Sequence, residues 1–406
     1  METRFRLPPV DLPMAIAALA LLVIGLLMVF SATTVPGAHQ GLWVRQLLWL
    51  GFALCAAWVA AAIHYRAYES LAYPLYLLSL VLLAAVLVVG TSAMGAKRWL
   101  DLGPLRFQPS EIAKIATVFV LARRFDAPRL DLTRLRHWLV PLLITSIPFA
   151  LVAKEPDLGT SLAFPVILIA MYYWAGMPLG QLALGLSPML NVLLFFLTGS
   201  LWWFGALFVG LVAAVRPKLS SLLVVLALNG AVAYTMPHLW EHLHDYQKRR
   251  IQTFLNPGQD PYGAGYQLIQ SKIAVGSGGF VGKGFLRGTQ KALAFLPMRH
   301  TDFIYSVVGE ELGFLGALTV VILYAIVVLR GFRLALAARN GFASLMTVGL
   351  VSALFYHIMV NILMTIGWAP VTGLPLPLIS YGGTALLVNC VQLGLLQNVA
   401  LRRQEY

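Results

Sequence analysis

Asp302 has the clearest potential for chemistry in this sequence. It ends a polar segment and is followed at once by an apolar run that begins at Phe303. A carboxylate at such a boundary is partly desolvated, which raises its pKa and makes it a better proton acceptor near neutral pH. His300 and Arg299 are close enough in sequence to modulate it. Asp302 is therefore our candidate general base, and it alternatively or additionally caps the following helix with help from Thr301.

Two opposite charges interrupt another apolar stretch. Glu111 and Lys114 have i, i+3 spacing, which places them on one face of a helix where they can pair. Charges within a membrane span are expensive and are functional candidates by default. The pair is either a neutralised structural contact with a neighbouring helix or the polar floor of a cavity open to the outside, reached from Gln108 and Ser110.

Two more polar groups interrupt apolar runs. Lys154, Glu155 and Asp157 form a cluster at the outer end of a run that includes residues 138–153. His357 and Asn361 have i, i+4 spacing within a later run, where a hydrogen bond between helices is a simpler interpretation than a ligand site. No set of His, Asp or Glu has the spacing of a metal site, and no phosphate-binding loop for nucleotides is present.

The composition identifies the elements that must position these residues. The chain has 406 residues, 59% hydrophobic and only 11% charged, with a mean hydropathy of +0.80. Soluble domains carry about 25% charged residues, so a soluble enzyme, a disordered chain and a nucleic-acid binder are excluded. Cys55 and Cys390 lie inside apolar runs, which argues against a disulfide framework. The sequence predicts an all-α polytopic membrane protein.

Twelve apolar runs are candidates for membrane-spanning helices, since about 20 mainly apolar residues cross the hydrocarbon. The first is too long for a signal-peptide core and is interpreted as a retained span. The run 201–215 is the least secure; without it a neighbour must also be removed, which leaves ten. The runs are 13–33, 43–63, 71–90, 108–122, 138–153, 160–176, 180–198, 201–215, 219–237, 305–329, 342–366 and 379–400.

Short basic connections set the orientation. The connection after the fourth run carries Arg123, Arg124, Arg129, Arg134 and Arg136 and should be cytoplasmic. Alternating from there puts both termini in the cytoplasm and the segments 91–107 and 238–304 outside. The second of these holds eight Lys or Arg against four Asp or Glu. This excess suggests an anionic ligand, although loops of this length also escape the charge rule.

The external segment has many glycines but also spaced aromatic and aliphatic residues, which indicates an ordered loop with short helical pieces such as 264–275. Glycines at 276, 278, 279, 282, 284 and 288 surround Lys283 and Arg287. They could cradle a phosphate, because backbone donors and point charges together suit a diphosphate. They could equally serve turns and close helix approach.

Six motifs together resemble the SEDS family of shape, elongation, division and sporulation proteins, and resemble its RodA branch more than its FtsW branch. They are GAKRWLDLGPLRFQPSEIAK (95–114), KEPDLGTSL (154–162), FLNPGQDPYGAGYQLIQSKIAVGSGG (254–279), GTQKALAFLPMRHTDF (288–303), EELGFLG (310–316) and GLPLPLISYGG (373–383). The family usually has ten spans, so 180–237 is expected to hold an extra helical hairpin within a single integral membrane domain, 1–406.

The resemblance implies a peptidoglycan glycosyltransferase that polymerises lipid II, works with a class B penicillin-binding protein and other elongation-complex proteins, and resides in the bacterial cytoplasmic membrane. Asp302 matches the family's essential aspartate, Trp99 its important loop tryptophan, and Glu111 with Lys114 its buried pair. Trp99 would stack on a sugar or anchor the loop at the interface. The residues expected to contact substrate are Lys97, Arg98, Trp99, Gln108, Glu111, Lys114, Asp157, Gln270, Lys283, His300, Thr301 and Ser380.

Chemistry of this kind needs a base for a sugar hydroxyl and cations for a diphosphate leaving group. Asp302 would be the base, and Lys97, Arg98, Lys114 and Lys283 would hold the diphosphates. No cofactor is required by the residues, and whether a divalent cation, magnesium or manganese, assists the diphosphate is left open. A lipid II flippase and a scaffold that only recruits the penicillin-binding protein are the alternative functions.

Overall fold

A computed structural model of the chain describes residues 10–34, 41–93, 96–102, 105–128, 131–132, 135–198, 202–215, 217–242, 248, 253–254, 265–289 and 298–402. Helices make up most of it. They are α1 (Leu12–Thr33), α2 (Leu42–Ala62), α3 (Tyr65–Ser70), α4 (Ala72–Val89), α5 (Pro109–Phe125), α6 (Leu135–Lys154), α7 (Leu158–Ser161), α8 (Ala163–Trp174), α9 (Leu179–Thr198), α10 (Trp202–Val215), α11 (Leu219–His242), α13 (Tyr266–Ser277), α15 (Ile304–Ala337), α16 (Gly341–Ile366) and α17 (Gly383–Leu401).

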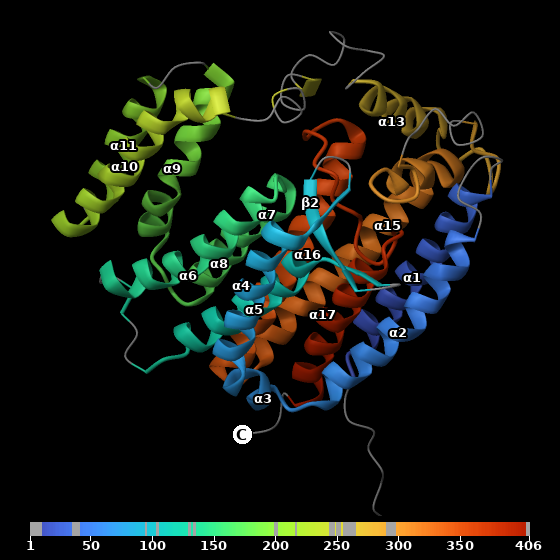
Figure 1. Ribbon diagram of the computed structural model, residues 1–406, viewed down its shortest axis with the longest axis horizontal. Coiled ribbons are helices and arrows are strands. Elements are labelled where there is room, and N and C mark those ends of the chain that lie inside the picture. The colour runs from blue at the N-terminus through green and yellow to red at the C-terminus, as the bar shows by residue number, and fades with distance from the viewer. Residues whose placement is uncertain are drawn as a thin grey trace, which may run out of the picture.

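The helices form a bundle with α16 and α17 at its centre (Figure 1). Within their apolar windows 61% of α16 and 72% of α17 is buried, against 17% of α2 and 28% of α4. The central helices therefore face other helices, while α2 and α4 present most of their apolar side chains outward, as lipid-facing helices do. The helices α1 and α2 lie on one flank, and α4, α6 and α8 lie on the other.

Each of the twelve predicted runs overlaps a helix, and the chain is a multi-pass membrane protein. Seven of the described helices are long and apolar enough to cross a membrane, so the count of twelve spans stays a prediction. The run 160–176 is divided into α7 and α8, and the run 379–400 begins as a helix only at Gly383. Three helices, α9, α10 and α11, occupy 180–237 and pack mainly on one another at the edge of the bundle (Figure 1).

A three-stranded antiparallel sheet, which was not expected from the sequence, lies at one end of the bundle (Figure 1). Its strands are β1 (Thr91–Ala93), β2 (Ala96–Leu102) and β3 (Leu105–Phe107), in the order β1-β2-β3. Two of the strands have only three residues, too few for the alternation of apolar and polar residues to be recognised. The hydroxyl of Thr384 donates to the carbonyl of Arg106 at 3.1 Å and ties β3 to the start of α17.

A break in α15 determines how the glycine-rich loop packs. Gly313 has φ +66° and ψ −162°, so the helix is interrupted there. The freed carbonyls of Glu310 and Glu311 accept hydrogen bonds from the backbone N–H groups of Lys283 and Gly284, both at 3.0 Å. Loop and broken helix therefore satisfy each other's backbone groups.

The glycines of this loop allow the close approach. A Cβ at Gly278 would collide with the carbonyl oxygen of Gly309, and one at Gly282 with the carbonyl oxygen of Glu311. Of the two interpretations of the glycine pattern, close helix approach is the one found at these positions. The helix predicted over 264–275 is found as α13, which lies across the outer ends of α15 and α16.

We expect Gly313→Ala to lower the free energy of unfolding by about 2–4 kcal/mol, because the new Cβ meets the backbone of Gly282 and the residue must keep a left-handed φ. Thermal unfolding of the purified chain in detergent measures the effect. Gly276→Ala is the matched control, since nothing lies within 4 Å of a Cβ there. Equal stability of both variants and the parent would contradict the role assigned to the break.

Candidate functional site

Residues 298–303 form the turn that leads into α15 and carries Asp302. The N–H groups of Thr301 and Phe303 both donate to the carbonyl of Met298, at 3.1 and 3.3 Å. Asp302 is partly exposed, whereas Phe303 is fully buried. The N-cap residue of α15 is Phe303, without a side-chain capping bond, so the prediction that Asp302 caps the helix is wrong. The aspartate stands one residue outside the helix, where the buried core meets the exterior.

The basic neighbours of Asp302 anchor the turn to other elements. Arg299 is buried, and its Nε donates to the carbonyl of Ala32 in α1 at 3.0 Å. Burial lowers the pKa of the Arg299 guanidinium, although an arginine stays charged over any physiological pH. The ring of His300 lies 5.8 Å from the ring of Tyr381. The turn is thus held against α1 on one side and against the segment before α17 on the other.

Glu111 and Lys114 form a buried ion pair on α5, as predicted, with Nζ 2.9 Å from Oε1. Only 2% of the Lys114 side chain is exposed. Its Nζ also lies 2.6 Å from Nε2 of His357 on α16. Because an ammonium can only donate, the imidazole accepts at Nε2 and carries its proton at Nδ1. The prediction that His357 makes a hydrogen bond between helices is confirmed, and its partner is Lys114.

Asp157 organises a second polar cluster at the outer end of the bundle. Its carboxylate caps α7 by accepting from the N–H of Thr160 at 3.1 Å and from its hydroxyl at 2.9 Å. Gln108 Nε2 lies 3.4 Å away and Arg98 Nη1 lies 3.7 Å away. Arg98 also donates from Nη2 to the carbonyl of Pro156 at 2.5 Å. Arg98, on β2, therefore fixes the turn between α6 and α7.

Glu155 is a buried carboxyl in the same turn, just beyond the end of α6. It is 1% exposed, and neither of its carboxyl oxygens has a hydrogen-bond partner among the described residues. Burial and the nearby charge of Asp157 raise the pKa of Glu155 to about 8, against an opposing effect of Arg98. The group is therefore mostly protonated at neutral pH, which avoids an uncompensated buried charge.

Lys283 forms an ion pair with a buried carboxylate of α15. Its Nζ lies 2.8 Å from Oε1 of Glu310, which is 1% exposed, and it donates to the hydroxyls of Ser277 and Thr289. The backbone N–H of Thr289 donates to the same carboxylate oxygen at 2.7 Å. The lysine therefore closes the glycine-rich loop onto α15.

The remaining predicted contacts lie on the outer elements. Trp99 is partly exposed on β2, where it pairs with Thr91, and Gln270 is partly exposed on α13. Lys97 also belongs to β2, but its side chain lies outside the described part of the chain. The other predicted basic residues that lie outside the described residues are Arg129, Arg134, Arg249, Arg250 and Lys291.

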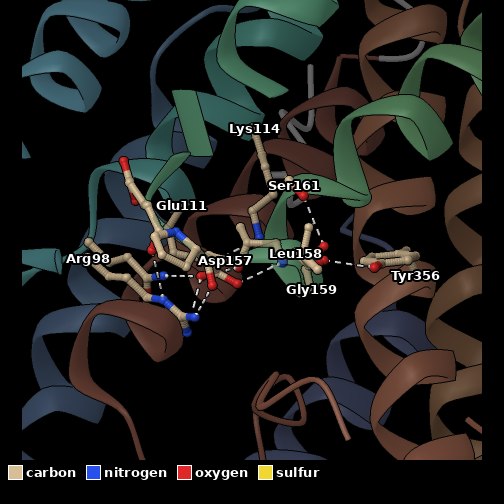
Figure 2. Close-up of polar contacts among 12 residues, drawn as sticks. Arg98, Glu111, Lys114, Asp157, Leu158, Gly159, Ser161 and Tyr356 are labelled. Carbon is tan, nitrogen blue, oxygen red and sulfur yellow. Dashed lines mark hydrogen bonds and ion pairs between the residues drawn. The ribbon is translucent and has the colours of Figure 1, made fainter. Parts of the chain in front are cut away.

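The structure brings most of the predicted residues into two sets. The first lies at the start of α5 and contains Arg98, Glu111, Lys114 and Asp157 (Figure 2), and Gln108 joins it through its contact with Asp157. The second lies in the turn before α15 and contains His300, Thr301, Asp302 and the buried Ser380. One helix contacts both sets, because His357 reaches Lys114 and Asn361 donates to the carbonyl of Asp302 at 2.9 Å. The i, i+4 spacing of the two α16 residues was the available signal, but it did not reveal their partners.

In the portions of the chain that the structure describes, no group of three or more His, Cys, Asp or Glu side chains could hold a metal ion. Glu111 is paired with Lys114, and Asp157 already accepts from Thr160. The donor set described here therefore does not fit a resident metal.

Comparison with known proteins gives matches along almost the whole chain. Residues 12–405 match the model of the FtsW, RodA and SpoVE family, described as cell cycle proteins. The chain is 40% identical to the peptidoglycan glycosyltransferase MrdB of Escherichia coli K12, over 97% of this chain and 94% of that protein. It is 35% identical to a probable peptidoglycan glycosyltransferase FtsW of Trichlorobacter lovleyi, over 98% of this chain and 94% of that protein.

Solved structures give similar matches. A chain of a peptidoglycan synthase complex that coordinates polymerization and crosslinking matches with a TM-score of 0.73 and 31% identity, covering 98% of this chain and 99% of that one. The rod shape determining protein RodA of Thermus thermophilus matches with a TM-score of 0.66 and 27% identity, covering 98% of each chain.

The titration of Glu155 predicts a pH dependence of stability. Its pKa is raised from 4.5 to about 8, so the folded state binds more protons than the unfolded state between these values. Stability should therefore fall as the pH rises through that window. Glu155→Gln should remove this part of the slope and raise the unfolding midpoint at pH 8–9, measured by thermal unfolding in detergent. Glu69→Gln, a partly exposed glutamate on α3, is the control; identical slopes in the parent and Glu155→Gln would contradict the assignment.

Proposed function

The chain belongs to the FtsW, RodA and SpoVE family of cell cycle proteins, and on that premise we propose that it is a peptidoglycan glycosyltransferase. It polymerises lipid II into glycan strands on the outer face of the bacterial cytoplasmic membrane during cell elongation and rod-shape maintenance. The support is the function named for its relatives at 35–40% identity over nearly the whole chain. The observation in the structure that carries the proposal is a partly exposed aspartate, Asp302, at the outer mouth of a buried polar framework.

The reaction transfers a glycosyl group to a sugar hydroxyl. The acceptor oxygen forms a bond to the anomeric carbon of the donor while the bond from that carbon to the diphosphate breaks, and a polyprenyl diphosphate leaves with the electron pair. Asp302 accepts the proton that the acceptor hydroxyl loses, a role that contributes about 10²–10⁴ in rate. Attack from the face opposite the leaving group inverts the anomeric carbon and gives a β-linked glycan.

The departing diphosphate needs positive charge. Lys114 and Lys283 form tight pairs with buried carboxylates, at 2.9 and 2.8 Å, whereas Arg98 lies 3.7 Å from Asp157 and is 21% exposed. Of the two cations in the first set, Arg98 is the more exposed one and can present its guanidinium to a phosphate while it holds the carbonyl of Pro156. Lys97 is its neighbour on β2. The buried Lys114 acts as a fixed charge beneath them. Magnesium or manganese, where the reaction uses it, would bind the substrate diphosphate; among the residues that the structure describes, no group of three or more His, Cys, Asp or Glu could hold it.

Partners and topology follow the same proposal. The related peptidoglycan synthase complex couples polymerization with crosslinking, so a class B penicillin-binding protein that carries the transpeptidase is the expected partner, together with other elongation-complex proteins. The chain is one integral membrane domain, 1–406, with both termini in the cytoplasm. Residues 238–304 form the external catalytic loop, and 180–237 contains the extra hairpin.

Asp302→Asn should abolish polymerisation of lipid II, with the rate falling by about 10²–10⁴, because the amide cannot accept the proton. Purified protein in detergent with labelled lipid II, with and without the partner, measures the products on gels. Asp101→Asn is the matched control, an acidic residue on the external sheet paired with Arg106 at 3.4 Å. Glycan formed without any membrane to cross favours the enzyme over a flippase; a fully active Asp302→Asn variant would refute the assigned base.

The orientation predicts which side of the membrane each connection faces. In a variant lacking Cys55 and Cys390, Asp101→Cys should react with a membrane-impermeant maleimide in intact cells, because β2 lies outside. Lys218→Cys, exposed between α10 and α11, should react only after the cells are permeabilised. Labelling of position 218 from the outside would overturn the assigned orientation and the twelve-span topology.

A further inference from the structure

Three consecutive carbonyl groups in the turn that carries Asp302 each accept a hydrogen bond from outside the turn. Such a run of bonds belongs to no helix or strand, so side chains and backbone of other segments must supply the donors. Tyr381 N donates to His300 O at 2.9 Å, Ser380 Oγ to Thr301 O at 2.6 Å, and Asn361 Nδ2 to Asp302 O at 2.9 Å.

The two side-chain donors are themselves fixed. Ser380 is 5% exposed, and its hydroxyl oxygen accepts from the N–H of Leu376 at 2.8 Å while its hydrogen is given to the turn. Asn361 is fully buried, and its amide nitrogen also donates to the carbonyl of Leu374 at 2.7 Å. Neither group can reorient without breaking a second bond.

The backbone of Ser380 is in turn held by α2. Gln46 donates from Nε2 to the carbonyl of Ser380 at 3.2 Å and accepts at Oε1 from the N–H of Gly382 at 3.3 Å. Gln46 is 3% exposed. The turn before α15 is therefore fastened to α16 and, through the segment before α17, to α2.

We propose that Asn361 and Ser380 are positioning residues for Asp302, a role that rests on the proposed function above. A base must lie within hydrogen-bond reach of the proton it removes, and a shift of about 1 Å can cost about 10²-fold in rate. The two donors fix the backbone on which the carboxylate stands, while the side chain remains partly exposed toward the outside. Ser380 was expected to contact substrate, but its hydroxyl hydrogen is donated to the carbonyl of Thr301 in the turn.

The test separates kcat from KM for lipid II polymerisation by the purified full-length chain. Ser380→Ala and Asn361→Ala should each lower kcat by about 10–100-fold and leave KM within about 3-fold, because a displaced base affects the transition state and not substrate binding. Ser380→Thr keeps the hydroxyl and should recover kcat to within about 3-fold of the parent. Ser352→Ala is the control, since this buried hydroxyl bonds only to Val348 O within α16 in the described structure.

Rates are normalised to the folded fraction from gel filtration and thermal unfolding, so that a loss of fold is not counted as a loss of kcat. A raised KM with unchanged kcat would overturn the inference, since it would make Ser380 or Asn361 a substrate contact. Unchanged kcat in both alanine variants, or no recovery in Ser380→Thr, would also overturn it. Asp302→Asn in the same assay separates the two proposals. If Asp302→Asn is inactive while both alanine variants are fully active, only the positioning inference fails. If Asp302→Asn is fully active, the assignment of Asp302 as the base fails first.

Discussion

A charge buried in hydrocarbon persists only beside an opposite charge or several hydrogen-bond partners, and this constraint sets how the helices of this chain pack. Among the described residues, three ion pairs of 2.9 Å or shorter place a buried carboxylate beside a cation. Lys114 with Glu111 faces His357 of α16, Lys283 with Glu310 closes the glycine-rich loop onto α15, and Arg330 with Asp11 links α15 to the start of α1 at 2.5 Å. Removing one member of a buried pair typically costs about 3–5 kcal/mol, a cost that applies to Glu111 and Lys114. Lys283 and Arg330 are 27% and 30% exposed, so their pairs contribute less.

The same constraint explains why α15 is broken. A continuous helix would leave no carbonyl for the external loop, whereas the interruption at Gly313 releases the carbonyls of Glu310 and Glu311 to the backbone of 283–284. The first part of α15 thereby becomes a short, fully bonded segment whose N-terminal end carries the turn with Asp302. The aspartate stands just before this segment and remains partly exposed.

Local patterns in the sequence predicted much of this arrangement, but they could not predict contacts between residues that are far apart in the chain. Apolar runs predicted helices because the hydropathy of a single segment determines whether it enters lipid. The i, i+3 spacing predicted the Glu111–Lys114 pair because both residues share a helix face. Lys283 and Glu310 are 27 residues apart, and Lys114 and His357 are 243 apart, so neither contact has a local signature. The three-stranded sheet was also not predicted, because its strands are too short to show a period. Asp302 was identified from the sequence, but its place one residue before the N-cap of α15 was not.

The position of α16 shows how separate motifs become one site. Its His357 and Asn361 lie four residues apart, which on a helix is about 6 Å along the axis and nearly the same face. One contacts the buried cation of α5 and the other holds the backbone of Asp302. The distance between the proposed base and that cation is therefore set by the rigid rise of a single helix and not by the loops that carry the motifs.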